Sequence, residues 1–464
     1  MAVVAAGLVL SGVTACGARW NDEQRAAVLS RQQGRTVTAA GTGDVSDAAV
    51  GDVSDAGTSG GVESAAQGGA GGGQGATAAA AGSKAAGGAA ANKSLPCAAP
   101  STEKGINPIT ITVGAISSES GPVPGLGSSA AAAVRAEVAR RNATGGVCGR
   151  KVVLKEADDG TDNARYRSTL RQLNPQVLGI SGGFALGDIG SEDLINELQI
   201  PIVNGPGADT WRVRWVFDIN PDLPKPDMVL GKYKYLHDQG ARKVSMSYLA
   251  VDQSRREANI QRRFMEAAGL QVVHVNELPL STLSYDSAAR AAANSGADYL
   301  WFIADTNGAA NMAKSVHDTG REWLFKEFSY TTYGTKFIDI AGADAAEGAT
   351  SWIRSLPTEE AASNKAMGAY VEWMNRAAPG LPQDLFSIDS YVSAKVFFEA
   401  LEALPGPITR EAFAKQMESI ESYDAAGMFG PILLGKEQSR GCTVGMIVQG
   451  GKWRRMAPAN GFLC

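Results

Sequence analysis

The chain has 464 residues, of which 44% are hydrophobic and 20% are charged, and its formal net charge is −5. This length allows two or three domains, and the scattered lysines and arginines form no basic cluster, which argues against nucleic acid as a partner. The three histidines, His237, His274 and His317, lie far apart and lack the spacing of metal ligands, so we expect neither a metal site nor a cofactor.

The N-terminal segment is predicted to direct the chain out of the cytoplasm. Residues 2–13 form an apolar run that is too short to span a bilayer, and Val13-Thr14-Ala15 precedes Cys16. The segment resembles a secretory hydrophobic region that ends in a bacterial lipobox, whose cysteine is lipidated. Residues 1–16 are therefore interpreted as a lipoprotein signal segment, which gives an extracytoplasmic chain anchored to the membrane through a lipid on Cys16. The alternative is a buried helix with an incidental cysteine.

Residues 17–96 are predicted to form a disordered tether. Between positions 41 and 91 the chain is almost entirely Ala, Gly, Ser, Thr, Asp and Val, which is too little apolar bulk to build a core. A Gly-rich coil of about 80 residues has an r.m.s. reach of roughly 50 Å. A lipid at one end of such a coil and a folded domain at the other are typical of a tethered surface receptor.

A first series of strands and helices follows the tether. The predicted strands are 109–116, 151–156, 177–180 and 200–203, and the predicted helices between them are 128–141, 163–173 and 187–198. Short β-branched runs that alternate with helical runs indicate βαβ units and a parallel sheet.

Glycine, serine and proline are concentrated where these strands end. The loops in question are 117–127, 157–162, 181–186 and 204–209. In a parallel sheet the crevice beyond the carboxyl ends of the strands holds ligands. Glycines let backbone N–H groups approach a bound solute, and the helices that follow add a dipole that favours anionic groups. The pattern therefore predicts a ligand cleft at this edge.

Four cysteines remain after Cys16, and four cysteines allow three pairings. Cys97 lies just before the first strand and Cys148 just before the second, and parallel strands begin at the same edge of a sheet, so we predict that these two pair. Cys442 opens a late strand, and Cys464 at the end of the sequence can fold back on it. Disulfides agree with an exported, oxidising location.

A second series of the same kind begins after the proline-rich segment 220–226. The predicted elements are helix 228–239, strand 243–248, helix 255–268, strand 271–275, helix 285–295, strand 299–303, helix 308–319 and strand 326–330. Long helices at 359–377 and 387–404 come next, and a hairpin turns at positions 450–451. Two similar α/β lobes are therefore expected.

Several motifs, in this order, resemble one known family. They are 111–114 (ITVG), 120–122 (SGP), 142–147 (NATGGV), 149–151 (GRK), 158–159 (DD), Gly179, 200–202 (IPI), 267–269 (AAG), 296–298 (GAD) and 429–432 (FGPI). The chain from residue 108 onward is similar to type I periplasmic binding proteins, specifically the branched-chain amino acid binding family of ABC importers. The resemblance implies an α/β fold of two similar doubly wound lobes joined by a hinge, with a small organic ligand trapped between them and no covalent chemistry.

The family resemblance also implies a division of the chain and a set of partners. One lobe would hold residues 97–222 and 350–425, and the other would hold 223–349 and 426–464. The partners would be the small-molecule ligand and the separately encoded permease and ATPase subunits of an importer. A ligand sensor with the same fold but no transporter is the main alternative.

When the ligand contacts of the family are carried over to this chain, several of its residues depart from the family's pattern. Where amino-acid binders place hydroxyl side chains after the third strand, this chain has Gly183-Phe184-Ala185, and its fourth loop has Gly205-Pro206, so only backbone donors remain for a carboxylate. The acidic residue that holds a ligand ammonium should fall near position 331, where there is none, and Asp305 is the nearest substitute. The candidate contacts are Glu119, Leu126, Gly183, Phe184, Ala185, Gly205, Pro206, Tyr248, Asp305, Tyr330 and Tyr333.

These residues suggest a pocket with apolar and aromatic walls rather than one for an ordinary α-amino acid, because a buried ammonium without a partner costs several kcal/mol. Each aromatic residue could instead belong to the core.

Two enzymatic alternatives rest on short motifs. Residues 179–183 match G-x-S-x-G, so Ser181 could be a hydrolase nucleophile, although no segment identifies the acid and histidine partners. Residues 125–130 fit part of a dinucleotide fingerprint, but the proline-broken loop before them is too long for the tight turn that a pyrophosphate requires. We therefore expect a binding protein and not an enzyme.

Overall fold

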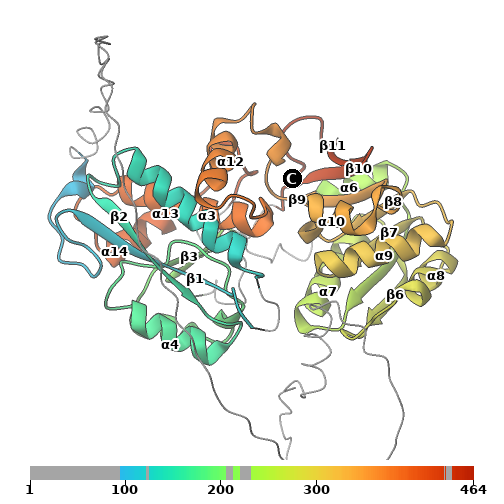
Figure 1. Cartoon of the computed structure of the whole chain (residues 1–464), viewed down its shortest axis with the longest axis horizontal. Coiled ribbons are helices and arrows are strands. Elements are labelled where there is room, and N and C mark those ends of the chain that lie inside the picture. Colours follow the sequence, from blue (N-terminus) through green and yellow to red (C-terminus); the bar gives the residue numbers. More distant parts are fainter. Residues whose placement is uncertain (1–94, 122–124, 205–212, 220–230, 433, 435–440) are drawn as a thin grey trace, which may run out of the picture. The chain divides into compact units, whose positions relative to one another are not determined.

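The computed structural model describes residues 95–121, 125–204, 213–219, 231–432, 434 and 441–464 (Figure 1). The signal segment with Cys16, nearly all of the proposed tether, and the loop residues Gly205 and Pro206 lie outside the described residues. Within the described ranges, no helix combines the length and the apolar character needed to cross a bilayer.

The first sheet is parallel and is assembled from two strand pairs and one bridging residue. Its strands are β1 (Thr110–Ser117), β2 (Lys151–Asp158), β3 (Ile202–Asn204) and β4 (Val216–Asp218). Strand β1 pairs with β2, and β3 pairs with β4. Ile180 joins the two pairs, because it forms parallel bridges to Gly114 in β1 and to Ile202 in β3. All carboxyl ends of these strands therefore meet at one edge of the sheet.

Helices from two distant parts of the chain pack on the first sheet. They are α3 (Ser128–Ala143), α4 (Asn163–Leu173) and α5 (Glu192–Leu198), and later α12 (Lys365–Ala377), α13 (Leu385–Glu402) and α14 (Arg410–Glu418). Helix α13 lies along α3 and also contacts β3. Because 14 of its 18 residues are buried, α13 is a core helix rather than a surface helix.

The second sheet has seven strands in the order β11-β10-β9-β8-β7-β5-β6. Their bounds are β5 (Lys243–Leu249), β6 (Gln271–Leu278), β7 (Tyr299–Ile303), β8 (Phe325–Phe328), β9 (Ala349–Ile353), β10 (Val444–Gln449) and β11 (Lys452–Ala457). Strands β5 to β9 are mutually parallel, whereas β10 runs antiparallel to both of its neighbours. The carboxyl ends of β5, β7, β8 and β9 therefore share one edge.

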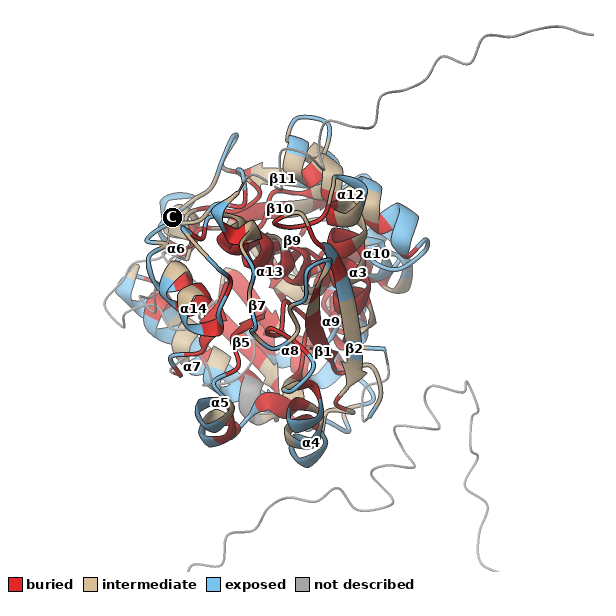
Figure 2. Cartoon of the chain, turned by 90° about the vertical axis from the view of Figure 1, so that its left-hand side faces the viewer, coloured by how far each residue is buried: buried red, intermediate tan, exposed pale blue. Residues whose placement is uncertain are grey.

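Helices cover both faces of the second sheet. They are α6 (Gly231–Asp238), α7 (Asp252–Ala267), α8 (Asp286–Asn294), α9 (Thr306–Asp318), α10 (Thr335–Ala341) and α11 (Ala343–Ala346). Successive strand residues point to opposite faces. Accordingly, Tyr299 and Trp301 of β7 pack in one apolar cluster with residues of α6 and α7, while Leu300 and Phe302 pack in another with α8 and α9. Figure 2 shows that β5 and β7 are buried, whereas α4 and α5 carry exposed residues.

The clusters of buried apolar residues indicate where the chain crosses between the two sheets. The division of the chain into two lobes remains a proposal. Strand β9 lies in the second sheet and all five of its residues are buried, and from Leu356 to Leu434 the buried apolar residues pack with those of the first sheet. The chain thus leaves the second sheet after Ile353 and returns to it after Leu434. We therefore propose these positions for the crossings in place of residues 350 and 425.

Several predicted elements differ from those observed. The third strand, 177–180, is reduced to bridges at Ile180, although the N–H of Leu178 donates to the Thr112 carbonyl in the manner of a strand. The helix predicted over 187–198 begins only at Glu192, because Gly190 adopts a φ of +73° after the short 3₁₀ turn η2 (Leu186–Asp188).

The helix predicted over 359–377 is likewise split, into the 3₁₀ turn η5 (Thr358–Glu360) and α12, whose first turn is capped by Asn364. The strand predicted to reach residue 330 ends at Phe328 and is followed by the turn η4 (Tyr330–Thr332). Strands β4 and β9 and helices α10, α11 and α14 were not predicted from the sequence.

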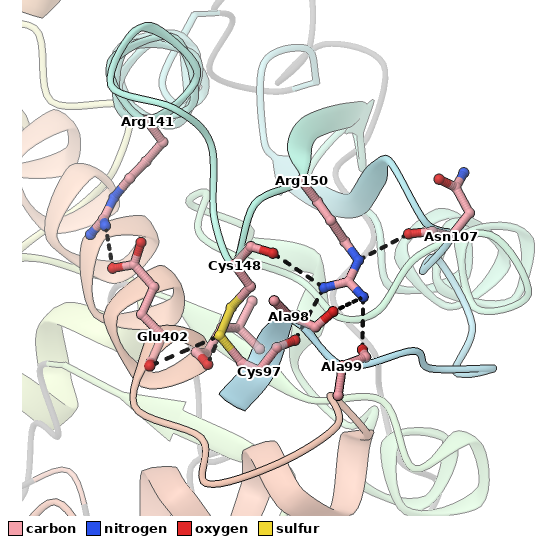
Figure 3. The surroundings of a disulfide bond; sticks show 9 residues. Cys97, Ala98, Ala99, Asn107, Arg141, Cys148, Arg150 and Glu402 are labelled. Carbon is pink, nitrogen blue, oxygen red and sulfur yellow. Dashed lines mark hydrogen bonds and ion pairs between the residues drawn. A yellow bond between two sulfur atoms is a disulfide. The ribbon is translucent and has the colours of Figure 1, made fainter. Parts of the chain in front are cut away.

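Both predicted disulfides are present, Cys97–Cys148 and Cys442–Cys464, and the first closes a loop of 51 residues. Figure 3 shows that Arg150 lies beside the first of them and donates to five backbone carbonyls. These carbonyls belong to Cys97, Ala98, Ala99, Asn107 and Cys148. Burial lowers the pKa of Arg150. The arrangement fastens the start of the described chain to the amino edge of the first sheet, away from the predicted ligand edge.

Candidate ligand-binding site

Two carboxylates organise the loops at the carboxyl edge of the first sheet. Asp159 is fully buried and accepts hydrogen bonds from the Ser118 hydroxyl at 2.7 Å and from the N–H groups of Thr161 and Gly187, both at 2.9 Å. These donors come from the loops after β1, β2 and residue 180. Asp159 therefore ties three loops together.

Asp158 does the same for the loop after β1. Its carboxylate accepts from the N–H groups of Glu119, Ser120 and Gly160 at 3.0, 3.1 and 2.9 Å, and from the Ser120 hydroxyl. Burial favours the neutral acid, but the hydrogen bonds led by those from Ser120 and Gly160 outweigh it and lower the pKa of Asp158 to about 2. Asp158 is therefore an anion that is already well satisfied within the protein.

Glycine is required at position 183 in the third loop. Gly183 has a φ of +117°, and a Cβ atom there would lie 2.1 Å from the carbonyl oxygen of Ile116. The next residue is held by the same strand, because the Phe184 carbonyl accepts from Ser118 N–H at 2.7 Å and Phe184 N–H donates to the Ser117 hydroxyl at 3.3 Å. Two backbone donors of the third loop, Phe184 N–H and Leu186 N–H, are thus engaged by serine hydroxyls.

The Phe184 ring packs against an aromatic partner that the sequence analysis did not identify. Its centroid lies 4.4 Å from that of Phe386, in the first turn of α13. Phe184 and Ala185 are only 6% and 5% exposed, whereas Leu126 and Glu119 in the first loop are half-buried. Burial raises the pKa of Glu119, although Arg135 opposes this shift. Apolar and aromatic side chains, of which Phe184 and Ala185 are buried and Leu126 is half-buried, therefore lie at this edge.

The carboxyl edge of the second sheet carries the remaining candidates. Asp305 follows β7, is exposed, and caps α9 by accepting from the N–H groups of Asn307 and Gly308, both at 3.2 Å. Tyr248, in β5, is half-buried, and its hydroxyl lies 3.4 Å from Glu277. Asp305 therefore has a clear structural role at the start of a helix.

Tyr333 is only 5% exposed, and its hydroxyl is engaged by the turn η5. It hydrogen-bonds to Glu359, lies 3.1 Å from the Thr358 hydroxyl and accepts from Thr358 N–H at 3.0 Å. Burial raises the pKa of Tyr333, and Glu359 adds to the shift. The ring of Tyr333 lies at an angle to that of Trp453, with centroids 5.9 Å apart. Tyr333 therefore fastens the segment that follows β9.

Tyr330 lies beside Arg354, which in turn contacts Asp389, and the sequence analysis missed both of these residues. The guanidinium carbon of Arg354 is 5.4 Å from the centre of the Tyr330 ring, and an Arg354 nitrogen lies 2.9 Å from the carboxylate of Asp389. Arg354 directly follows β9, so the carboxyl-edge rule would have placed it here if the run 349–353 had been identified as a strand. Asp389 and Phe386 had no comparable signal, because both lie within a long apolar helix.

The enzymatic alternatives find no supporting geometry among the described residues. Ser181 is completely buried, and its hydroxyl lies 3.4 Å from the Gly114 carbonyl, which it satisfies as a donor. His274 lies in the other sheet, where its Nδ1 is 2.8 Å from the Ser245 hydroxyl. In the same described ranges, no group of three or more His, Cys, Asp or Glu residues is arranged to hold a metal ion.

The chain is similar to several known proteins. The Leu/Ile/Val-binding protein homolog 8 of Brucella abortus (strain 2308) is 25% identical over 367 residues, which cover 74% of this chain and 89% of that protein. A solved fatty acid ABC transporter substrate-binding protein from Thermomonospora curvata has a TM-score of 0.64 at 20% identity, covering 78% of this chain and 94% of the other.

A branched-chain amino acid transporter substrate-binding protein from Streptococcus pneumoniae, solved in complex with isoleucine, has a TM-score of 0.60 at 16% identity and covers 75% of this chain and all of the other. These likenesses confirm the predicted fold class. The model of the periplasmic binding protein family matches residues 110–452, which is most of the chain. This match also agrees with the expectation of a binding protein rather than an enzyme. The chain therefore belongs to the periplasmic binding protein family.

Proposed function

We propose that this protein is the extracytoplasmic solute-binding component of an ABC importer and that it binds a small organic ligand at the carboxyl edges of its two sheets. The observation that carries the proposal is the edge of the first sheet, where Asp158 and Asp159 hold three loops in place, the third of which carries Phe184. Loops fixed in this way form a site before the ligand arrives, which lowers the entropic cost of binding. The named functions of the relatives support the same proposal.

Ligand binding is proposed to favour a closed arrangement of the two lobes. A ligand shifts such an equilibrium only through its differential affinity for the two states, so contacts from both sheets are needed. The proposed contacts are Glu119, Leu126, Gly183, Phe184, Ala185, Gly205, Pro206, Tyr248 and Tyr330. Asp305 and Tyr333, whose polar atoms are engaged within the fold, are proposed to support the surrounding loops.

The proposal includes the N-terminal tether and its lipid. Cys16 would carry the lipid, residues 17–96 would span the distance to the membrane, and the permease and ATPase would be separate subunits. Mass spectrometry of the mature N-terminus should find a lipidated cysteine. A Cys16→Ser variant should be released into the soluble fraction with its ligand binding intact, and unchanged membrane association of this variant would contradict the anchor.

Binding is tested by thermal unfolding of the purified protein against a panel of amino acids, amides, aromatic acids, aliphatic acids and sugars. A ligand at one hundred times its Kd stabilises the folded state by about 2.7 kcal/mol, which raises Tm by several degrees. No stabilisation by any compound of this panel would overturn the proposed function. Loss of ligand uptake in a deletion strain distinguishes an importer component from a sensor of the same fold.

A further inference from the structure

Arg354 lies at the carboxyl edge of the second sheet, where its side chain is within reach of a ligand bound at that edge. It directly follows β9, which runs parallel to β8, while Tyr330 lies just beyond the end of β8. The guanidinium lies over the Tyr330 ring at 5.4 Å, and 19% of the Arg354 side chain remains exposed. A partly exposed cation is therefore held at the same edge as the proposed ligand contacts.

Asp389 fixes the direction of this cation. Its side chain is 1% exposed, and its carboxylate lies 2.9 Å from one terminal nitrogen of Arg354. Such a carboxylate orients the guanidinium and reduces the entropy lost when a further acceptor binds. A guanidinium carries five N–H donors in a planar fork, so one carboxylate partner does not preclude a second one.

Helix α13 brings an apolar surface next to the same cation. Phe386 precedes Asp389 by three residues, and residues with this spacing are neighbours on one face of a helix. Phe386 in turn packs on Phe184 at 4.4 Å. A continuous path of contacts thus leads from Phe184 through one turn of α13 to Arg354. The path joins aromatic side chains to a cation, which suits a molecule with an apolar body and an acidic end.

Three of the carboxylates at these edges are engaged within the fold, which makes them poor partners for a ligand ammonium. Asp158 and Asp159 accept hydrogen bonds from the loops of the first sheet, and Asp305 caps α9. An α-amino acid whose carboxylate met Arg354 would bring its ammonium close to a second positive charge. Two like charges in a partly buried site disfavour each other.

We propose that Arg354 binds the acidic group of the ligand, whose apolar body packs on Phe184 and Phe386, and that the ligand is a carboxylic acid without an α-amino group. This inference rests on the proposed function and specifies the chemical class of its solute. It assigns Arg354 and Phe386 as ligand contacts and Asp389 as a positioning residue.

Two matched sets of probes test the ligand class with the unmodified protein. The first set is 4-methylpentanoate, 4-methylpentanamide and leucine, and the second is 3-phenylpropanoate, 3-phenylpropanamide and phenylalanine. Within each set the apolar body is constant and only the polar end changes. In at least one set, calorimetry should give a Kd for the acid that is about tenfold or more lower than for the amide and the amino acid.

A double variant, Arg354→Gln with Asp389→Asn, tests the assigned residues without leaving a buried carboxylate unpaired. We expect it to lose the preference for the acid over the amide. The matched control is Arg455→Gln with Glu360→Gln, which removes an ion pair whose arginine, on strand β11, is similarly buried at 13% exposed and whose carboxylate is 30% exposed. The control pair should lower Tm and leave the acid-to-amide ratio of Kd values unchanged.

Each result has a defined meaning. An amino acid or an amide that binds as tightly as its acid would overturn this inference while supporting the proposed function. An acid preference that survives in the Arg354 double variant would have the same two consequences. If none of the six probes binds but an amino acid, amide or sugar of the broad panel does, the inference again fails alone, whereas binding of an aliphatic or aromatic acid of that panel supports it. No binding in either experiment would overturn the proposed function and the inference with it.

Discussion

The carboxyl edges of the two sheets are built in different ways. At the first edge, carboxylates and serine hydroxyls accept hydrogen bonds from backbone N–H groups of neighbouring loops, as Asp159 does from Thr161 and Gly187. At the second edge, longer side chains reach across to other elements, as Tyr333 does to Thr358 and Arg354 does to Asp389. The first edge is thus fixed by local backbone contacts, whereas the second depends on contacts between segments far apart in the chain.

This difference has a physical consequence for function. Loops whose backbone N–H groups are bonded to buried carboxylates lose little freedom on ligand binding, so they can present a constant surface. Contacts between side chains of distant segments form and break when those segments move relative to one another. We therefore expect changes at the first edge to destabilise the fold and changes at the second to alter ligand preference or closure.

The largest expected effect is that of Gly183→Ala at the first edge. The added Cβ would lie 2.1 Å from the Ile116 carbonyl oxygen at a φ of +117°, so the loop or β1 must shift. Overpacking and backbone strain together should lower the free energy of unfolding by about 3–5 kcal/mol. Urea unfolding monitored by circular dichroism measures this loss.

Gly190→Ala is the matched control for this substitution. Gly190 also has a positive φ, +73°, but no atom lies within 4 Å of the position of its Cβ. Only the conformational cost of about 1 kcal/mol should remain. Equal losses in the two variants would show that contact with β1 does not restrict the third loop.

The next largest effect is expected for Asp159 at the first edge, and Asp305 at the second edge serves as the comparison. Asp159→Ala leaves three donors without their acceptor in a fully buried site, which should cost about 3 kcal/mol or more. Asp305→Ala removes an exposed helix cap and should cost about 1 kcal/mol. Chemical denaturation of both variants gives the two values. A larger loss of stability for Asp305→Ala than for Asp159→Ala would contradict the proposal that the fold depends more on carboxylates of the first edge than on those of the second.

Elements with a strong local pattern, in both sheets, were the easier ones to predict from the sequence. Helix α4 was predicted with its observed bounds, because Asp162 caps its first turn and Tyr166, Leu170 and Leu173 follow the helical period on the buried face. Strand β7 was likewise predicted in full from its apolar run. Signals of this kind lie within a few residues of the element that they specify.

Strand β9 and the contacts of Arg354 had no such local signal. The run 349–353 contains threonine and serine, and it is a strand because β8 and β10 pair with its two sides. Arg354 and Asp389 are 35 residues apart, and Tyr333 meets Thr358 across 25 residues. Pairings of this kind depend on tertiary structure, so sequence patterns identified Tyr333 as a candidate but not its partners.

Tyr333→Phe tests the second edge with a smaller change. The substitution keeps the ring beside Trp453 and removes the hydroxyl that bonds to Thr358 and Glu359. Loss of these hydrogen bonds should lower the free energy of unfolding by about 1–2 kcal/mol. Because Thr358 lies in the segment that leaves the second sheet, hydrogen exchange at η5 should also become faster. Unchanged exchange at η5 would contradict the role given to Tyr333 in fastening this segment.

The smallest expected effect is the pH dependence that Asp158 gives to the first edge. Its pKa falls from 3.8 to about 2 in the folded protein, so between these values the unfolded chain binds more protons. The stabilisation is therefore complete above about pH 5 and is lost as the pH falls towards 2. Because the side chain is 22% exposed, solvent screening reduces the contribution to about 1–2 kcal/mol.

Asp158→Asn removes this titration while keeping the size of the side chain. The variant should be less stable than the unsubstituted protein at pH 6, and the difference between the two should shrink as the pH approaches 2. Urea unfolding of both proteins at several pH values measures that difference in the free energy of unfolding. The other acidic side chains titrate in both proteins, so their contributions cancel in the difference. A constant difference would mean that Asp158 organises the first edge through its shape and hydrogen bonds and not through its charge.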